Sequence, residues 1–155
     1  MGQYHLTYNL DKREIINPHG LGMGIKQAEQ IGGEWSVGDF LALLLAGTGE
    51  KRGGGDFATS HVDGEQVIGR WAGDRVVVIG DYADPGDVPS LGDGVYQEAI
   101  ETAWEHTDGE GAPLHPKPRD ITPLLVEWME REPWCHITVT PSAYGWAQRT
   151  EGPRL

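Results

Sequence analysis

Two histidine–threonine pairs have types and spacing that suit phosphate chemistry. His5 and Thr7 lie near the start of the chain, His136 and Thr138 lie near its end, and each pair falls in a strand-like alternation. Residues two apart on a strand project from the same face. Two such strands side by side would bring two imidazoles and two hydroxyls together. One imidazole would then act as general base and the other as general acid, while the threonines hold a phosphate.

This pair of motifs resembles the two-histidine phosphoesterases, which cleave cyclic phosphates and related nucleotides. The resemblance implies His5, Thr7, His136 and Thr138 as catalytic residues. It departs from the family in one respect, because His5 precedes every expected helix, whereas the family usually carries its first motif after one. The alternative is that these are ordinary residues on the solvent side of half-exposed strands. The sequence therefore leaves open whether the protein is an enzyme.

The second candidate site is a block of glycine, arginine and aspartate around the apolar run 76–79. Three consecutive glycines at 53–55 allow a ligand or another strand to come close. We expect this block to bind a protein partner or a small ligand through Arg52, Asp56, Arg70, Trp71, Arg75, Asp81 and Tyr82. The alternative is structural: an aspartate that shapes a turn and arginines that pair with nearby acids.

Short motifs around this block resemble those of an uncharacterised family of small bacterial and phage-type proteins. They are Met-Gly-Gln-Tyr and Asn-Leu-Asp-Lys near the start, then Arg-Gly-Gly-Gly-Asp-Phe, then Gly-Arg-Trp-Ala-Gly-Asp-Arg and Gly-Asp-Tyr-Ala. The resemblance covers roughly residues 1–87. It implies a grouping and no mechanism, because the family has no assigned activity.

Metal and thiol chemistry have weaker signals. Asp81, Asp84 and Asp87 recur at every third position and offer oxygen ligands for calcium or magnesium, but not with EF-hand spacing. A solvated acidic turn is the preferred interpretation, so we expect no metal and no cofactor. Cys135 is the single cysteine, which excludes an intramolecular disulfide. Its side chain and that of His136 should point to opposite faces of a strand, which argues against a catalytic pair.

The charge is strongly negative. The chain has 24 acidic and 12 basic residues, a net charge of −12, and should repel nucleic acids and anionic membranes. The preferred interpretation is that the charge serves solubility; the alternative is that it matches a basic protein surface, and a small ligand is the other candidate partner. The longest apolar run, 40–46, is too short to cross a bilayer, and no signal-like segment is present. We therefore expect a soluble cytoplasmic protein, whose role, ligand and oligomeric state the sequence does not give.

The elements that would position these residues follow from periodicity and capping. Alternation predicts a hairpin of strands 4–10 and 13–16, a second hairpin of 67–71 and 75–82 with an interior strand at 76–79, and a last strand at 135–139. Ser36 with Asp39 predicts a helix over 37–46, Asp93 caps another, and Thr122 before a proline begins a third. The length suits one domain, residues 1–155. We predict an α+β fold, with a mainly antiparallel sheet of about five strands and helices on one face.

Overall fold

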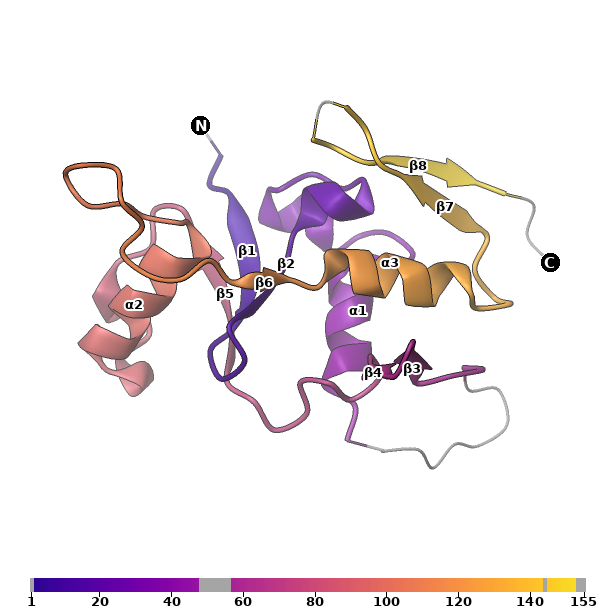
Figure 1. The fold of residues 1–155 in the computed structure, drawn as a ribbon, viewed down its shortest axis with the longest axis horizontal. Coiled ribbons are helices and arrows are strands. Elements are labelled where there is room, and N and C mark those ends of the chain that lie inside the picture. The colour runs from indigo at the N-terminus through magenta and orange to yellow at the C-terminus, as the bar shows by residue number, and fades with distance from the viewer. Residues whose placement is uncertain (1, 48–56, 144, 153–155) are drawn as a thin grey trace.

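The computed structural model describes residues 2–47, 57–143 and 145–152, and these contain three α-helices and eight strands (Figure 1). The helices are α1 (Val37–Leu44), α2 (Asp93–Ala103) and α3 (Thr122–Glu130). The strands are β1 (His5–Asn9), β2 (Glu14–Ile16), β3 (His61–Val62), β4 (Glu65–Gln66), β5 (Val76–Gly80), β6 (Arg119–Asp120), β7 (Ile137–Thr140) and β8 (Gln148–Glu151). Four short 3-10 helices are η1 (Pro18–Leu21), η2 (Gln27–Gln30), η3 (Pro85–Asp87) and η4 (Pro89–Leu91). The predicted α+β class is confirmed.

The main sheet has four strands in the order β5-β1-β2-β6, not the five expected. β1 pairs antiparallel with both β5 and β2, and the short β6 adds to β2 in parallel. The remaining strands form two separate hairpins, β3–β4 and β7–β8. The predicted N-terminal hairpin is present, and its first strand, β1, pairs with a strand on each side.

Helices cover both faces of this sheet, which corrects the expectation of one covered face (Figure 1). Tyr8 and Ile79 lie on the face that packs against Tyr96 and Ile100 of α2. Ile16 lies on the opposite face, in a larger core with α1 and α3. Because both faces are covered, β1 is buried from its second residue onward.

Local capping explains where α1 and α3 begin. Ser36 Oγ accepts the Asp39 N–H at 3.3 Å, and the Asp39 carboxylate accepts the Ser36 N–H at 3.1 Å, the capping box expected from the sequence. α3 begins at Thr122 with proline in its first turn, also as expected. The Thr122 hydroxyl accepts the Asn17 N–H at 2.8 Å, which ties α3 to the segment that follows β2.

The second predicted hairpin is wrong. Residues 67–71 form turns whose N–H groups complete the C-terminus of α1: Gly69 donates to Leu43 at 2.9 Å and Trp71 to Leu44 at 2.8 Å. β5 pairs instead with β1 and lies at the edge of the sheet. The run 76–79 is therefore not an interior strand, and Val78 is 42% exposed.

Residues 145–152 fold back over the body of the protein on the α3 side of the sheet (Figure 1). Ala147 N–H donates to the His19 carbonyl at 2.8 Å, and the Trp146 ring stacks on His19 with centroids 4.5 Å apart. Gly22 has φ +70°, and a Cβ there would lie 2.9 Å from the Ala147 carbonyl oxygen. The close approach of these segments thus requires glycine.

Candidate functional site

The two histidine–threonine pairs do not share a face. β1 is flanked by β5 and β2, while β7 pairs with β8 in a separate hairpin. Thr7 is 1% exposed, so its hydroxyl faces no open surface. His136 precedes β7, and its Nε2 lies 2.8 Å from Glu34 Oε2. Thr138 is exposed on the other hairpin. The neighbouring strands that a shared phosphate would need are absent from the described part of the chain.

Two members of the central block, Arg70 and Trp71, are bound to a buried acid. The Arg70 Nε donates to both Glu14 oxygens, at 3.1 and 2.9 Å, and its Nη2 lies 2.7 Å from Oε2. The indole of Trp71 donates to Glu14 Oε1 at 3.3 Å. Glu14 is 3% exposed and Trp71 is fully buried. These contacts assign Arg70 and Trp71 to the core and its boundary.

Arg75 is also paired, through the turn that joins β1 to β2. Its N–H and guanidinium donate to Asp11, with Nη2 2.8 Å from Oδ1, and these bonds hold the pKa of Asp11 below its usual range. Lys12 and the Asn9 side chain donate to Asp74 and lower its pKa likewise. The Asn-Leu-Asp-Lys and Gly-Asp-Arg motifs are therefore two halves of one hydrogen-bonded cluster.

The rest of the central block lies elsewhere. The Asp81 carboxylate accepts the Tyr4 N–H at 2.9 Å, and Tyr82 beside it is 63% exposed. Both follow β5, whereas Arg75 precedes it, so five strand residues, about 16 Å, separate them. Arg52 and Asp56 lie outside the described residues. The described members therefore do not converge on one surface.

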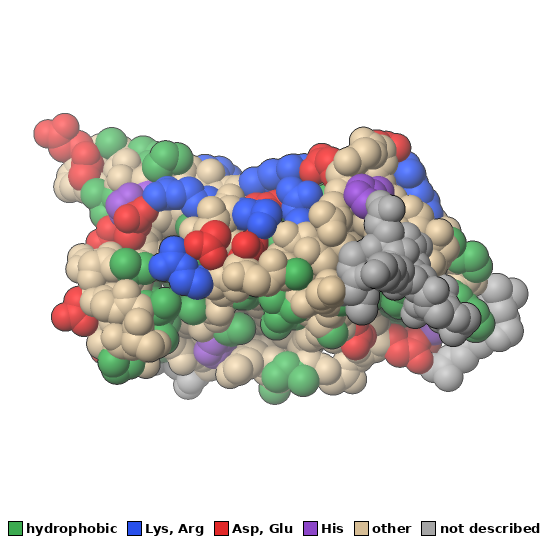
Figure 2. All heavy atoms as spheres, turned by 90° about the horizontal axis from the view of Figure 1, so that it is seen from below, with side chains coloured by type: hydrophobic (Ala, Val, Ile, Leu, Met, Phe, Trp, Pro, Cys, Tyr) green, Lys and Arg blue, Asp and Glu red, His purple; other side chains and the backbone are tan. Residues whose placement is uncertain are grey.

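The underside of the molecule shows the same pairing of charges. In the upper part of this face, lysine and arginine side chains lie beside aspartate and glutamate side chains (Figure 2). Arg119 and Arg70 both contact Glu65, for example, at 2.8 and 3.4 Å. Exposed ion pairs contribute little to stability, and they leave no uniform field over this face for a charged partner.

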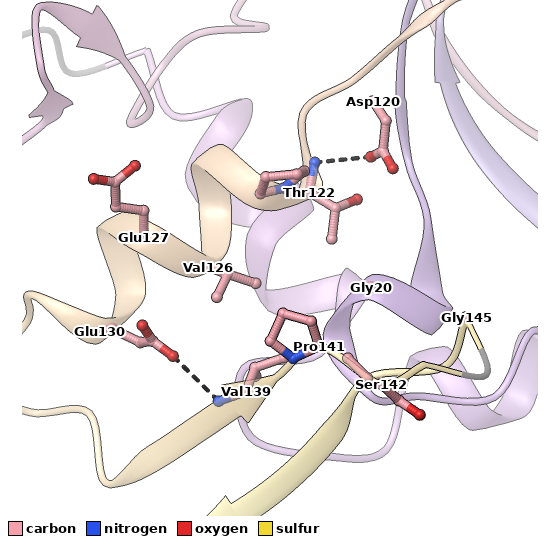
Figure 3. A pocket seen from close by; sticks show the side chains of 12 residues that line it. Gly20, Asp120, Thr122, Val126, Glu127, Glu130, Val139, Pro141, Ser142 and Gly145 are labelled. Carbon is pink, nitrogen blue, oxygen red and sulfur yellow. Dashed lines mark hydrogen bonds between the residues drawn. The ribbon is translucent and has the colours of Figure 1, made fainter.

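A pocket of about 420 Å³ opens between α3 and the β7–β8 hairpin, and we call it the α3 pocket (Figure 3). Its apolar wall consists of Val126, Val139, Pro141 and Ala147. Val126 of α3 faces Pro141 and Val139 of the hairpin across the space. Cavities of this size commonly hold small molecules or single side chains of a partner.

Carboxylates supply most of the polar lining of the α3 pocket. Asp120 accepts the Thr122 N–H at 2.9 Å, and Glu130 accepts the Val139 N–H at 3.2 Å, each through one oxygen. Glu127 pairs with Arg131, one turn further along α3. Among the described residues that line the pocket there is no lysine, arginine or histidine. The lining is thus apolar with a negative rim, which favours a positively charged occupant.

A second hollow, of about 530 Å³, is bordered by aromatic rings, and we call it the aromatic pocket. Its ring-bearing residues are Trp35, Phe57 and Trp134. The rest of the lining is Glu34 before α1, Asp39, Ala42 and Leu43 of α1, and His136 before β7. The rings of Trp35 and Phe57 lie 6.0 Å apart at 58°. Trp134 is 67% exposed. Its indole is therefore accessible to a ligand at the edge of this hollow.

The backbone of the aromatic pocket is held in a strained conformation. Trp35 has φ +54°, a left-handed conformation that costs on the order of 1–2 kcal/mol for a residue with a side chain. Arg149 of β8 donates to the Glu34 carbonyl at 2.9 Å and to the Trp35 carbonyl at 2.7 Å. Burial lowers the pKa of Arg149. Such strain persists only where surrounding contacts hold it, and it is concentrated at functional sites.

Neither pocket was found from the sequence. Trp35, Phe57 and Trp134 come from three separate segments with no common spacing, so no local signal joins them. In the described residues no three histidine, cysteine, aspartate or glutamate side chains gather as metal ligands. Cys135 is partly buried, and burial raises the pKa of its thiol.

Comparison with known proteins adds no assignment. No family model, curated protein or solved structure matches the chain. Within the described residues, no helix has the length and apolar character to cross a bilayer.

Proposed function

We propose that this protein acts by binding, and that its α3 pocket receives a basic, amphipathic segment of a partner protein. The observation that carries the proposal is the lining of that pocket: an apolar wall, three carboxylates and no cationic side chain among the described lining residues. A lysine or arginine side chain matches this surface, because its methylene stem packs on apolar groups while its charge reaches the rim.

The electrostatics of the whole chain support the same partner. With a net charge of −12, the protein attracts a cationic segment at long range and raises its rate of association. The α3 pocket adds an apolar contact with the bound segment, which net charge alone does not provide. Asp120 and Glu130 each use one oxygen for a backbone N–H, and a carboxylate has a second oxygen that can accept from a ligand.

The test compares two triple variants that change the net charge equally. D120N/E127Q/E130Q neutralises the pocket rim, and the amide oxygens can still accept the backbone N–H groups of Thr122 and Val139. E98Q/E105Q/E110Q neutralises three acids on and after α2. Binding of a labelled lysine–leucine peptide is measured by fluorescence anisotropy at several salt concentrations.

We expect the pocket variant to weaken binding roughly tenfold or more, since three partly exposed charge contacts each contribute up to about 1 kcal/mol. The control variant should change affinity by less than about twofold at 0.15 M salt. Equal losses in the two variants would show that the peptide follows overall charge, and the α3 pocket would then have no role.

A further inference from the structure

Trp134 is a large apolar side chain that is exposed to solvent at the edge of a cavity. It is 67% exposed and borders the aromatic pocket, whose other rings, Trp35 and Phe57, are partly buried. Trp35 and Phe57 pack on the core through Trp128, with centroids 5.8 and 5.1 Å from its ring. Packing on the core therefore holds the rings of Trp35 and Phe57 in place, whereas the ring of Trp134 is exposed to solvent.

Two carboxylates and His136 also line the aromatic pocket, and each carboxylate lies close to a nitrogen of the protein. Glu34 Oε2 lies 2.8 Å from His136 Nε2, and Asp39 Oδ2 accepts the N–H of Ser36 at 3.1 Å. They supply negative charge with few open acceptor positions. A ligand here gains from charge and from aromatic faces more than from many hydrogen bonds.

From these features we infer that the aromatic pocket binds a methylated ammonium group, the head of a quaternary ammonium compound. Such a cation has no N–H donors to satisfy, and its charge is spread over methyl groups that pack on rings. A cation within about 6 Å of an aromatic centroid is attracted by the ring's negative face, most strongly by tryptophan. Trp35, Phe57 and Trp134 all line this hollow, and Glu34 adds a carboxylate.

The strained backbone beneath the pocket supports this inference independently. Trp35 is held at φ +54° while Arg149 binds the carbonyls of Glu34 and Trp35. These bonds fix the backbone of Glu34 and Trp35 before any ligand arrives. A site prepared in this way loses less conformational freedom on binding. The guanidinium donors that bind these carbonyls point at backbone, so they are not free to attract an anion.

The test is isothermal titration calorimetry with three probes of the same shape. Choline carries the quaternary ammonium, 3,3-dimethyl-1-butanol is its neutral carbon isostere, and 3,3-dimethylbutyrate is an anionic relative. We expect choline to bind at least about tenfold more tightly than the isostere, and the anion to bind more weakly still. Equal affinity for choline and the isostere, preference for the anion, or no heat with choline would each overturn the inference.

Matched variants locate the binding. Trp134→Ala removes the free wall and should weaken choline binding about five- to tenfold, and Glu34→Gln should weaken it severalfold. Trp146→Ala is the control, because Trp146 is 46% exposed but stacks on His19 away from this pocket. If both tryptophan variants weaken binding equally, the aromatic pocket is not the site. Trp134 and Glu34 are not among the residues that line the α3 pocket, so this inference and the proposed function succeed or fail separately.

Discussion

The ion pair between Arg70 and Glu14 offers the sharpest test of the structure, and Arg70→Met is the perturbation. In the folded protein the guanidinium supplies two Nε bonds and a 2.7 Å Nη2 contact to a carboxylate that is 3% exposed. The variant leaves Glu14 buried with only the Trp71 indole, 3.3 Å away, as a described side-chain donor.

The magnitude follows from the desolvation of a charge. Removing one partner of a buried pair costs about 3–5 kcal/mol, because the other charge is left without compensation. For a domain of this size each kcal/mol lowers Tm by about 2–4 °C, so a fall of roughly 6–20 °C is expected. Arg75→Met is the matched control. The Arg75 side chain is 57% exposed, so solvent screens its pair with Asp11 and the control variant should unfold at nearly the same temperature as the original protein.

Urea unfolding followed by circular dichroism gives the free energy of unfolding for each variant, with equal m-values as the check on two-state behaviour. The double variant Arg70→Met with Glu14→Gln should recover about half of the loss or more, because glutamine accepts from the Trp71 indole without a buried charge. A single variant within about 1 kcal/mol of the original protein, or a double variant no more stable than the single, would refute the reasoning.

Three further predictions concern single side chains. Gly22→Ala should lower the free energy of unfolding by about 1–3 kcal/mol, because φ is +70° and the new Cβ would lie 2.9 Å from the Ala147 carbonyl oxygen. Cys135 should react with iodoacetamide more slowly in the folded than in the urea-unfolded protein at pH 7.5, since burial raises its pKa and little thiolate forms. Asp11→Asn should flatten the loss of stability in acid measured by urea unfolding from pH 7 to 3. Arg75 depresses the pKa of Asp11 in the folded state, so its stabilisation is complete above the unfolded pKa and disappears as pH falls through the folded one.

Each of these predictions has a control. Gly32→Ala should be tolerated, because Gly32 has ordinary backbone angles and nothing within 4 Å of the added Cβ. Equal destabilisation by the two glycine variants would contradict the close approach at Gly22. Equal alkylation rates in folded and unfolded protein would show Cys135 to be accessible. If the free energy of unfolding fell equally from pH 7 to 3 in Asp11→Asn and in the original protein, the pair of Asp11 with Arg75 would not form in solution.

Local signals predicted the elements that depend on local contacts. Ser36 and Asp39 cap α1 through bonds three residues apart, and Thr122 with the following proline begins α3. Of the two predicted hairpins only the N-terminal one is present, and its two strands are adjacent in the sequence. The alternation at 67–71 predicted a strand. In the structure, N–H groups of this segment donate to carbonyls at the end of α1. The periodicity of 67–71 carries no information about that helix.

The candidate sites show the same division. Residues singled out for their charge, Arg70, Arg75 and Asp81, do form specific contacts, as expected of charges beside glycine. Their partners are Glu14, Asp11 and the Tyr4 N–H of the N-terminal hairpin, and those contacts hold the fold together. β8 was missed altogether because its sequence, Gln-Arg-Thr-Glu, is polar and has no alternation. Both pockets depend on residues that only tertiary structure brings together.

The pairing of β1 has a consequence for synthesis of the chain. His5 pairs with Gly80, about 75 positions later, and Glu14 pairs with Arg119. At 5–20 residues per second, roughly 4–15 s pass between translation of β1 and of its β5 partner. Throughout that interval Tyr8 and Ile16 are without most of their core. The sheet can therefore form only after β5 and β6 have been translated, so its assembly depends on the later two thirds of the chain.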